Sequence, residues 1–258
     1  MDSSQEPMAL YSSKLTSAGF NHAFFTRYGG ISEPPFDSLN FSLATGDAPA
    51  AVQENMRRAG CVLGVPAEKI YLLNQVHGVQ ALQVHGDDPR EEMLRRDGDI
   101  VFSADSSLAC GTRTADCGPL LFADPRSGLV AAAHAGWRGT VAGVVVATVE
   151  AVARLGVRPE ELIVAIGPMI ERCCFEVGEE VAQTIAAAGA AGASVIDHSQ
   201  AKPHVDLRAV LVAQLRTLEV TNIVHVAGCT QCRPDIFHSY RRDGKVGGRM
   251  LSAIVPRA

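Results

Sequence analysis

The strongest constraint on the fold is a series of short apolar runs that alternates with helical patterns only in part. Runs rich in Val, Ile, Leu and Ala predict β-strands at residues 23–26, 70–76, 79–84, 108–115, 119–123, 129–133, 162–166 and 223–227. Periodicity typical of helices is found at residues 50–63, 140–155, 178–188 and 206–218. Because strands and helices do not follow a strict βαβ order, we expect an α+β fold in which mixed β-sheets are sandwiched and flanked by helices.

The chain shows neither an internal repeat nor an obvious linker between domains. Its 258 residues are 47% hydrophobic, which is enough to build one large core. We therefore expect residues 1–258 to form a single domain. In the clearest helix, at 206–218, Asp206 is the predicted N-cap and one face is mostly apolar, so we assign this helix to the scaffold.

Charge and targeting signals narrow the choice of partners. The formal net charge of −5 and the pI near 5.9 give no broad attraction to nucleic acid or anionic lipid. The N-terminal stretch MDSSQEPMALYSS lacks the basic and apolar regions of a signal peptide, and no run approaches the roughly 20 apolar residues of a transmembrane helix. We expect a cytoplasmic protein, a monomer or weak homodimer, with neither a nucleic-acid nor a membrane partner.

Three segments place a reactive side chain where an apolar run ends. They are NQVHG with His77, TADCGPLLFAD with Cys117, and AAAHAGWRGT with His134. Loops that follow strands are common sites of catalysis because the strand fixes the position and the loop exposes the side chain. Two imidazoles and one thiolate supply three N/S ligands, which leave a catalytic zinc one open position. The same donors also suit copper, so residue type alone does not name the metal.

Each of these residues also has a purely structural interpretation. A single His after a strand is more often hydrogen-bonded in the core, and a single Cys is more often inert. The chain has no HExxH motif and no paired zinc-ribbon spacing. Arg138 is a natural partner for phosphate or carboxylate beside the helix predicted at 140–155, although a surface salt bridge would explain it equally well.

The seven cysteines are expected to be reduced, because the chain is too long to need disulfide staples. Cys61 and Cys110 lie among apolar residues and are predicted to be small buried side chains. The adjacent pair Cys173–Cys174 and the CxxC pair Cys229–Cys232 are interpreted as mainly structural, with Cys229 the one that approaches the site. The segment SYRRDG, residues 239–244, is either a binding lip or a solvated charge run.

Taken together, the segments resemble the bacterial family known as multicopper polyphenol oxidoreductase or laccase-domain proteins, also called purine nucleoside phosphorylases and peptidoglycan editing factors. The resemblance runs through FFTRYGGIS, FDSLNFS, NQVHG, TADCGPLLFAD, AAAHAGWRGT, IGPMIERCCFEVG and FHSYRRDG, hence nearly the whole chain. It implies an α+β fold and a zinc site whose ligands map onto His77, Cys117 and His134. It also implies phosphorolysis of adenosine, inosine and methylthioadenosine, together with adenosine deamination.

Our leading hypothesis is therefore a zinc-dependent purine nucleoside phosphorylase with adenosine deaminase activity. His77, Cys117 and His134 are the expected metal ligands and catalytic residues, and Asp116 is the expected proton shuttle. The substrates are a small-molecule nucleoside and phosphate. The predicted substrate-binding residues, including arginines for phosphate and a ring for the purine, are Arg138, Arg27, Asn40 and Trp137.

Three other functions remain open at this point. A copper-dependent phenol oxidase needs several copper ions, and laccase-type sites draw on many histidines. Only eight are present here, and those outside the three segments lack clustered spacing. An amidase-like hydrolase of peptidoglycan precursors would use Cys117 as nucleophile and His77 or His134 as base. A non-catalytic binding role is less consistent with so many polar residues at strand ends.

Overall fold

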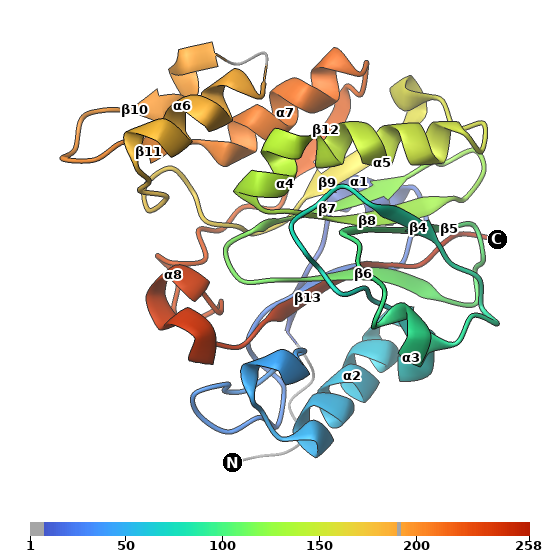
Figure 1. The fold of residues 1–258 in the computed structure, drawn as a ribbon. Helices are drawn as coiled ribbons and strands as arrows, with labels where there is room; N and C mark the ends of the chain where they lie inside the picture. The colour runs from blue at the N-terminus through green and yellow to red at the C-terminus, as the bar shows by residue number, and fades with distance from the viewer. Residues whose placement is uncertain (1–7, 190–191) are drawn as a thin grey trace.

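The computed structural model describes residues 8–189 and 192–258 and is built in four layers (Figure 1). From top to bottom in Figure 1, these are a layer of helices, a six-stranded sheet, a five-stranded sheet and a second helical layer. The prediction of an α+β fold with mixed sheets flanked by helices is confirmed. The first seven residues of the N-terminal stretch discussed above lie outside the described residues, as do residues 190–191.

The six-stranded sheet has the order β12-β9-β7-β8-β5-β4. Its strands are β12 (Asn222–His225), β9 (Ile163–Ile166), β7 (Gly118–Ala123), β8 (Val130–Ala135), β5 (Ile100–Ser103) and β4 (Ala81–Gln83). The two outer pairs, β12–β9 and β5–β4, are parallel, and the inner pairs are antiparallel. In the central pair β7–β8, Pro119 lies opposite His134, so the segment that carries Cys117 begins beside the strand that carries His134.

The five-stranded sheet has the order β1-β2-β13-β6-β3. Its strands are β1 (Ala9–Leu10), β2 (His22–Phe25), β13 (Met250–Ile254), β6 (Ala109–Thr114) and β3 (Ile70–Tyr71). Only β3 and β6 are parallel. A small separate hairpin joins β10 (Ile196–Asp197) to β11 (His204–Val205).

Helices cover the outer face of each sheet (Figure 1). The layer over the six-stranded sheet is made of α4 (Trp137–Ala142), α5 (Val144–Ala153), α6 (Glu179–Ala187) and α7 (Leu207–Thr217). The remaining helices are α1 (Ser13–Ser17), α2 (Pro49–Leu63) and α3 (Arg90–Met93), together with α8 (Tyr240–Asp243) near the site. The N-cap prediction for α7 is confirmed, because the Asp206 carboxylate accepts the backbone N–H of Ala209 at 2.9 Å.

Strand β7 explains why the apolar runs of the sequence are continuous rather than alternating. Leu120 and Phe122 point into the core under helices α5 and α7, while Leu121 and Ala123 point into the core between the two sheets. Side chains alternate between the faces of a strand, and here both faces are buried. A third core lies between the five-stranded sheet and α2.

Several predicted boundaries are wrong. The helix predicted at 140–155 begins at Trp137 and is divided at Gly143, whose φ of 93° ends α4 and starts α5. The strand predicted at 70–76 is reduced to β3 because the chain turns toward the site after Leu73. Strand β13 at the centre of the five-stranded sheet and strand β5, next to the edge strand β4 of the six-stranded sheet, were not predicted.

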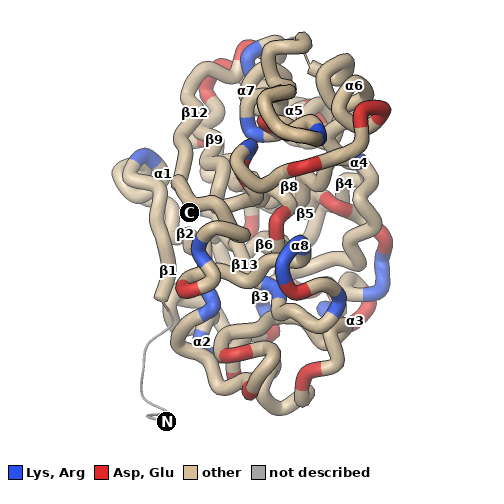
Figure 2. The backbone as a smooth tube through the Cα atoms, turned by 90° about the vertical axis from the view of Figure 1, so that its left-hand side faces the viewer, with Lys and Arg blue, Asp and Glu red and all other residues tan. Residues whose placement is uncertain are grey.

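No helix among the described residues is long and apolar enough to cross a membrane. Lys and Arg are interspersed with Asp and Glu along the chain in the view of Figure 2, rather than gathered on one side.

Candidate metal centre

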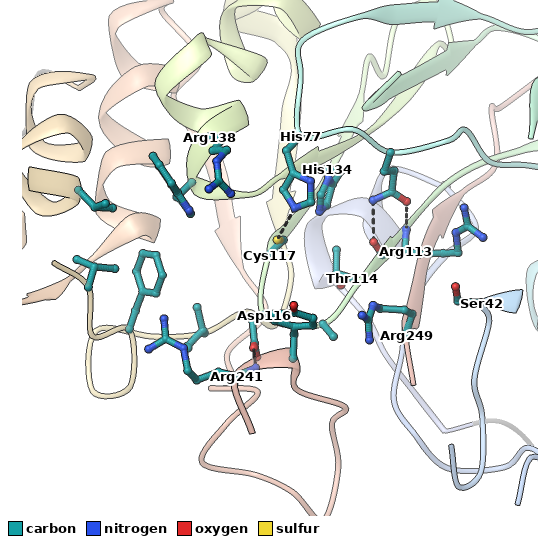
Figure 3. Close-up of a pocket in the computed structure, with 18 of the residues that line it drawn as sticks. Ser42, His77, Arg113, Thr114, Asp116, Cys117, His134, Arg138, Arg241 and Arg249 are labelled. Atoms are coloured by element: carbon teal, nitrogen blue, oxygen red, sulfur yellow. Dashed lines mark hydrogen bonds between the residues drawn. The ribbon is translucent and has the colours of Figure 1, made fainter. Parts of the chain in front are cut away.

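Three separate segments bring the predicted ligands to one place (Figure 3). His77 lies in the loop after β3, Cys117 precedes β7, and His134 lies within β8. The ligand atoms of the three residues all lie within 4.8 Å of one another. Cys117 Sγ is 3.8 Å from His77 Nε2, and the two imidazole ring centroids are 4.8 Å apart. The convergence predicted from the sequence is therefore present in the structure.

A buried carboxylate that the sequence analysis missed organises this group. The Asp99 carboxylate accepts a hydrogen bond from Nδ1 of His134 at 2.7 Å. This bond leaves Nε2 of the same ring free to bind a metal. Asp99 also accepts the backbone N–H groups of Val76, His77 and Gly78 at 3.2, 3.0 and 2.7 Å. One side chain thus fixes both the loop that carries His77, whose φ is 60°, and the ring of His134. Its only sequence signal is an acidic residue directly before the apolar run IVF.

The electrostatics of the group favour an ionised thiol. Burial would raise the pKa of Cys117, but the imidazoles of His134 and His77 overcome this effect and lower it to about 6. Burial would likewise lower the pKa of His134, but Cys117 and Asp99 raise it to about 9. Hydrogen bonds from His134, Gly78 and Val76 lower the pKa of Asp99 against the effect of burial. The thiolate is the form that binds metals and attacks electrophiles.

Gly136 leaves the space that the ligands occupy. A Cβ atom at this position would lie 2.6 Å from His77 Cδ2 and 3.1 Å from Cys117 Sγ. Its φ of −72° is open to any residue, so the restriction is steric contact alone. The AHAGWRG segment therefore needs glycine for close packing of the ligands rather than for a turn.

Asp116 supports the ligand loop from the other side. Its φ is 82°, and its two carboxylate oxygens accept Thr230 Oγ1 and the backbone N–H of Arg241, each at 2.6 Å. Both oxygens are engaged in the frame that positions Cys117. The structure therefore presents Asp116 as a positioning residue, and its role as a proton shuttle stays a prediction.

The side chains of His77, Cys117 and His134, called the metal group below, face a cavity of about 690 Å³. Apolar and aromatic side chains form one part of the lining, namely Trp137, Ile170, Phe175, Val177 and Val181. Arg113 and Arg249 lie together with Ser42 on one side of the metal group, and Arg138 and Arg241 lie on the other (Figure 3). A cavity of this size and composition suits a small ligand with a planar apolar part and an anionic part.

Arg113 and Arg249 are the second feature that the sequence analysis missed. Neither guanidinium forms an ion pair with a carboxylate in the described part of the chain. Burial lowers the pKa of each, and the repulsion between them adds to this for Arg113. Backbone carbonyls partner the two guanidinium groups: Arg113 donates to Leu73 O at 3.1 Å, and Arg249 donates to Gly247 O at 2.7 Å and Gly248 O at 3.0 Å. These neutral partners leave the positive charges uncompensated, so the pair can attract an anion.

The other predicted substrate residues have different positions. Trp137 and Arg138 line the cavity, with the Arg138 guanidinium carbon 4.5 Å from the centroid of the Trp137 ring. Arg27 does not line it, because its guanidinium pairs with Asp37 and with the carbonyl of Pro234. Asn40 is fully buried and also lies outside the lining.

Asn40 is nevertheless connected to the site. Its Oδ1 accepts the backbone N–H of Arg249 at 2.8 Å, and its amide donates to Asp47 at 2.9 Å. The polar atoms of Asn40 and Arg27 have protein partners away from the cavity, and the role of both residues in substrate binding stays a prediction. The helix predicted to direct its amides at the site is the six-residue α4, too short to be the long helix dipole expected.

Among the remaining cysteines, Cys110 is buried as predicted. The prediction for Cys61 is wrong, because it lies on the exposed side of α2. Cys229, predicted to approach the site, does not line the cavity and instead lies beside three other thiols.

Comparison with known proteins agrees with this geometry. The family described as multi-copper polyphenol oxidoreductase laccase matches residues 21–257. The chain belongs to this family. A relative from Deinococcus radiodurans named purine nucleoside phosphorylase is 41% identical over 92% of this chain and 89% of its own. The purine nucleoside phosphorylase YfiH of Escherichia coli is 39% identical over 89% of this chain and 90% of its own.

Solved structures of similar proteins have the same fold. A Bacillus licheniformis hypothetical protein, YfiH, superposes with a TM-score of 0.90 at 28% identity and covers 97% of both chains. YlmD from Geobacillus stearothermophilus gives 0.87 at 32% identity over 93% of both chains. The family resemblance inferred from the sequence motifs is confirmed.

The family motif FHSYRRDG contributes a buried imidazole that predicts acid sensitivity. His238 is 0% exposed, and neither ring nitrogen has a hydrogen-bond partner among the described residues. Burial lowers its pKa to about 3, and the positive charge of Arg27 adds to the shift. In the unfolded chain this imidazole takes up a proton near pH 6.5, whereas in the folded chain it stays neutral until about pH 3. His238 therefore does not lower the free energy of unfolding above about pH 6.5. Between about pH 6.5 and 3 it lowers this free energy by at most roughly 1.4 kcal/mol for each pH unit.

We therefore expect His238→Leu to lose less unfolding free energy than the wild type between about pH 7 and pH 5. Denaturant unfolding at both pH values measures the difference. EDTA is included because the metal ligands also titrate. Equal losses in the two proteins would show that His238 does not contribute to acid sensitivity.

Proposed function

We propose that the protein is a zinc-dependent purine nucleoside phosphorylase that also deaminates adenosine. The observation that carries this proposal is a single cavity that holds the His77, Cys117 and His134 group between an apolar, aromatic lining and an arginine pair. A purine nucleoside and phosphate need these three elements together. The names of the relatives from D. radiodurans and E. coli support the phosphorolysis part.

The donor set fits zinc. Two imidazole nitrogens and one thiolate leave a fourth position open, and Asp99 supplies the carboxylate that orients a ligating histidine. Zinc bound by these residues would act as a Lewis acid and generate a nucleophile from water at neutral pH for deamination.

The other residues would bind and orient the substrates. Trp137 and Phe175 line the cavity, and their rings would supply the aromatic surface for a purine. Arg113 and Arg249 would hold phosphate on the opposite side, where their charges stabilise the group that attacks the ribose carbon as the bond to the base breaks. The products are free base and ribose 1-phosphate, so no further reactant is required.

Two measurements test the proposal directly. Chromatography of adenosine, inosine and methylthioadenosine incubated with phosphate should show base release that depends on phosphate. Chelation should remove both base release and inosine formation from adenosine, and added zinc should restore them. Turnover that persists in metal-free protein would contradict zinc dependence.

The arginine pair leads to a separate prediction for phosphate. Arg249→Gln is expected to raise the KM for phosphate roughly ten- to a hundredfold, because one charge-assisted hydrogen bond contributes about 1.5 to 3 kcal/mol. Deamination of adenosine, which needs no phosphate, should change much less. Steady-state kinetics of both reactions measure the difference, with exposed Lys245→Gln as the charge-matched control.

Arg138→Ala is the informative comparison, because Arg138 lies on the opposite side of the metal group. The sequence alone favoured Arg138 as the phosphate ligand. A phosphate effect in this variant and none in Arg249→Gln would contradict the placement of phosphate between Arg113 and Arg249.

One observation favours a second candidate function. Cys117, His134 and Asp99 are arranged as a nucleophile, a base and the carboxylate that orients the base. This arrangement would suit an amidase-like hydrolase of peptidoglycan precursors. Chelation distinguishes the two functions, since a cysteine hydrolase would keep its activity without metal and lose it on alkylation of Cys117.

Copper-dependent phenol oxidation rests on the description of the family. Among the described residues, histidines join a potential metal group only as the pair His77 and His134. We therefore propose zinc as the metal, with nucleoside and phosphate as the partners of the protein.

A further inference from the structure

A second group of potential metal ligands lies outside the cavity. It consists of four thiols, and their sulfur atoms all lie within 4.8 Å of one another: Cys173, Cys174, Cys229 and Cys232. Cys232 Sγ is 3.6 Å from Cys173 Sγ and 3.3 Å from Cys174 Sγ. None of the four lines the cavity.

The topology explains why two distant segments meet here. Strands β9 and β12 are parallel neighbours, so the chain leaves both strands at the same edge of the sheet. The two loops then continue side by side through a bridge between Met169 and Cys229. The Met169 N–H donates to Gly228 O at 3.2 Å, and the Thr230 N–H donates to Met169 O at 3.1 Å.

The spacing of the sulfurs agrees with tetrahedral coordination. Zn–S bonds of roughly 2.3 Å place the sulfurs of a four-thiolate site about 3.8 Å apart. The two distances to Cys232 lie close to this value.

We propose that Cys173, Cys174, Cys229 and Cys232 bind one zinc ion as a structural site. Four sulfur ligands complete the coordination of zinc and leave no position for substrate, in contrast to the group at the cavity. This ion would hold the loop after β9 to the loop after β12.

Both loops form part of the catalytic region. Ile170 and Phe175, which flank the first cysteine pair, line the cavity. Thr230, within the CxxC segment, donates to Asp116 next to Cys117. The second ion would thus stabilise one wall of the cavity without taking part in the reaction.

The test is the zinc content of purified protein, measured by mass spectrometry. Wild-type protein should contain two equivalents per chain, one for each group of ligands. Cys117→Ser should lose one equivalent and Cys229→Ser/Cys232→Ser the other, while the control Cys61→Ser should keep both. One equivalent in the wild type, unchanged in the double variant, would overturn the proposal.

A second measurement does not depend on how the variants fold. Native wild-type protein saturated with zinc is alkylated before and after treatment with EDTA, and the labelled peptides are identified by mass. Zinc should protect all four cysteines, and EDTA should expose them together. A disulfide between Cys174 and Cys232 in protein purified under reducing conditions would overturn the proposal. Equal alkylation of the four cysteines before and after EDTA treatment would also overturn it.

Discussion

Cys117→Ser is expected to reduce phosphorolysis and deamination together by more than about a hundredfold while the chain stays folded. The reason is that serine replaces the soft thiolate between His77 and His134 with a poorly ligating hydroxyl. The change is nearly isosteric, and the side chain lies at the cavity rather than in a hydrophobic core. Both reactions should fail together because they share one metal group.

Kinetics of the two reactions, zinc content and circular dichroism measure this result. Cys61→Ser is the matched control, because Cys61 is exposed on α2 and lies outside both groups of ligands. Loss of one reaction with the other preserved would contradict a shared metal centre. Full activity in a variant that has lost its zinc from this group would contradict a catalytic metal altogether.

Asp99→Asn is expected to weaken zinc binding at the same group by about ten- to a hundredfold. An amide can donate where Asp99 only accepts, so the bond from His134 and the bonds from the backbone of the His77 loop cannot all be kept. The thermal midpoint should fall as well, because a buried group is left without its partner. Titration of metal-free protein against a zinc indicator measures the affinity.

Asp105→Asn provides the comparison for a purely structural effect. Asp105 also accepts backbone N–H groups, those of Gly86 and Ser107, but it does not contact the ligands. We expect this variant to change stability without changing zinc affinity. An Asp99→Asn protein that lost stability but bound zinc normally would show that Asp99 has no role in the metal site.

The sequence predicted those parts of the fold that depend on local pattern. Apolar runs buried on both faces identified β7, β8 and β9, and the cap at Asp206 identified the start of α7. Strand β5 is as short as β9 but was missed, and both β5 and β13 are recognised only through their pairing with neighbouring strands. The break at Gly143 was hidden because the apolar pattern continues through α4 and α5.

The same distinction holds for the site. His77, Cys117 and His134 each follow an apolar run, so their residue types and positions were informative. Asp99 forms its hydrogen bonds with residues 21 to 35 positions away in the chain, and a local sequence pattern cannot predict such contacts. Arg113 could have been singled out, because it is the one charged residue in the predicted strand 108–115. Arg249 could not, because it directly precedes β13, a strand that the sequence did not predict.

Gly136 has a consequence for protein engineering. A library that varies His77 or Cys117 to change the metal would normally leave neighbouring residues free as well. The space for the present ligands exists only because residue 136 has no side chain, since a Cβ there would lie 2.6 Å from His77 Cδ2. Position 136 should therefore be held constant while the ligands are varied, or varied only together with a smaller group at position 77.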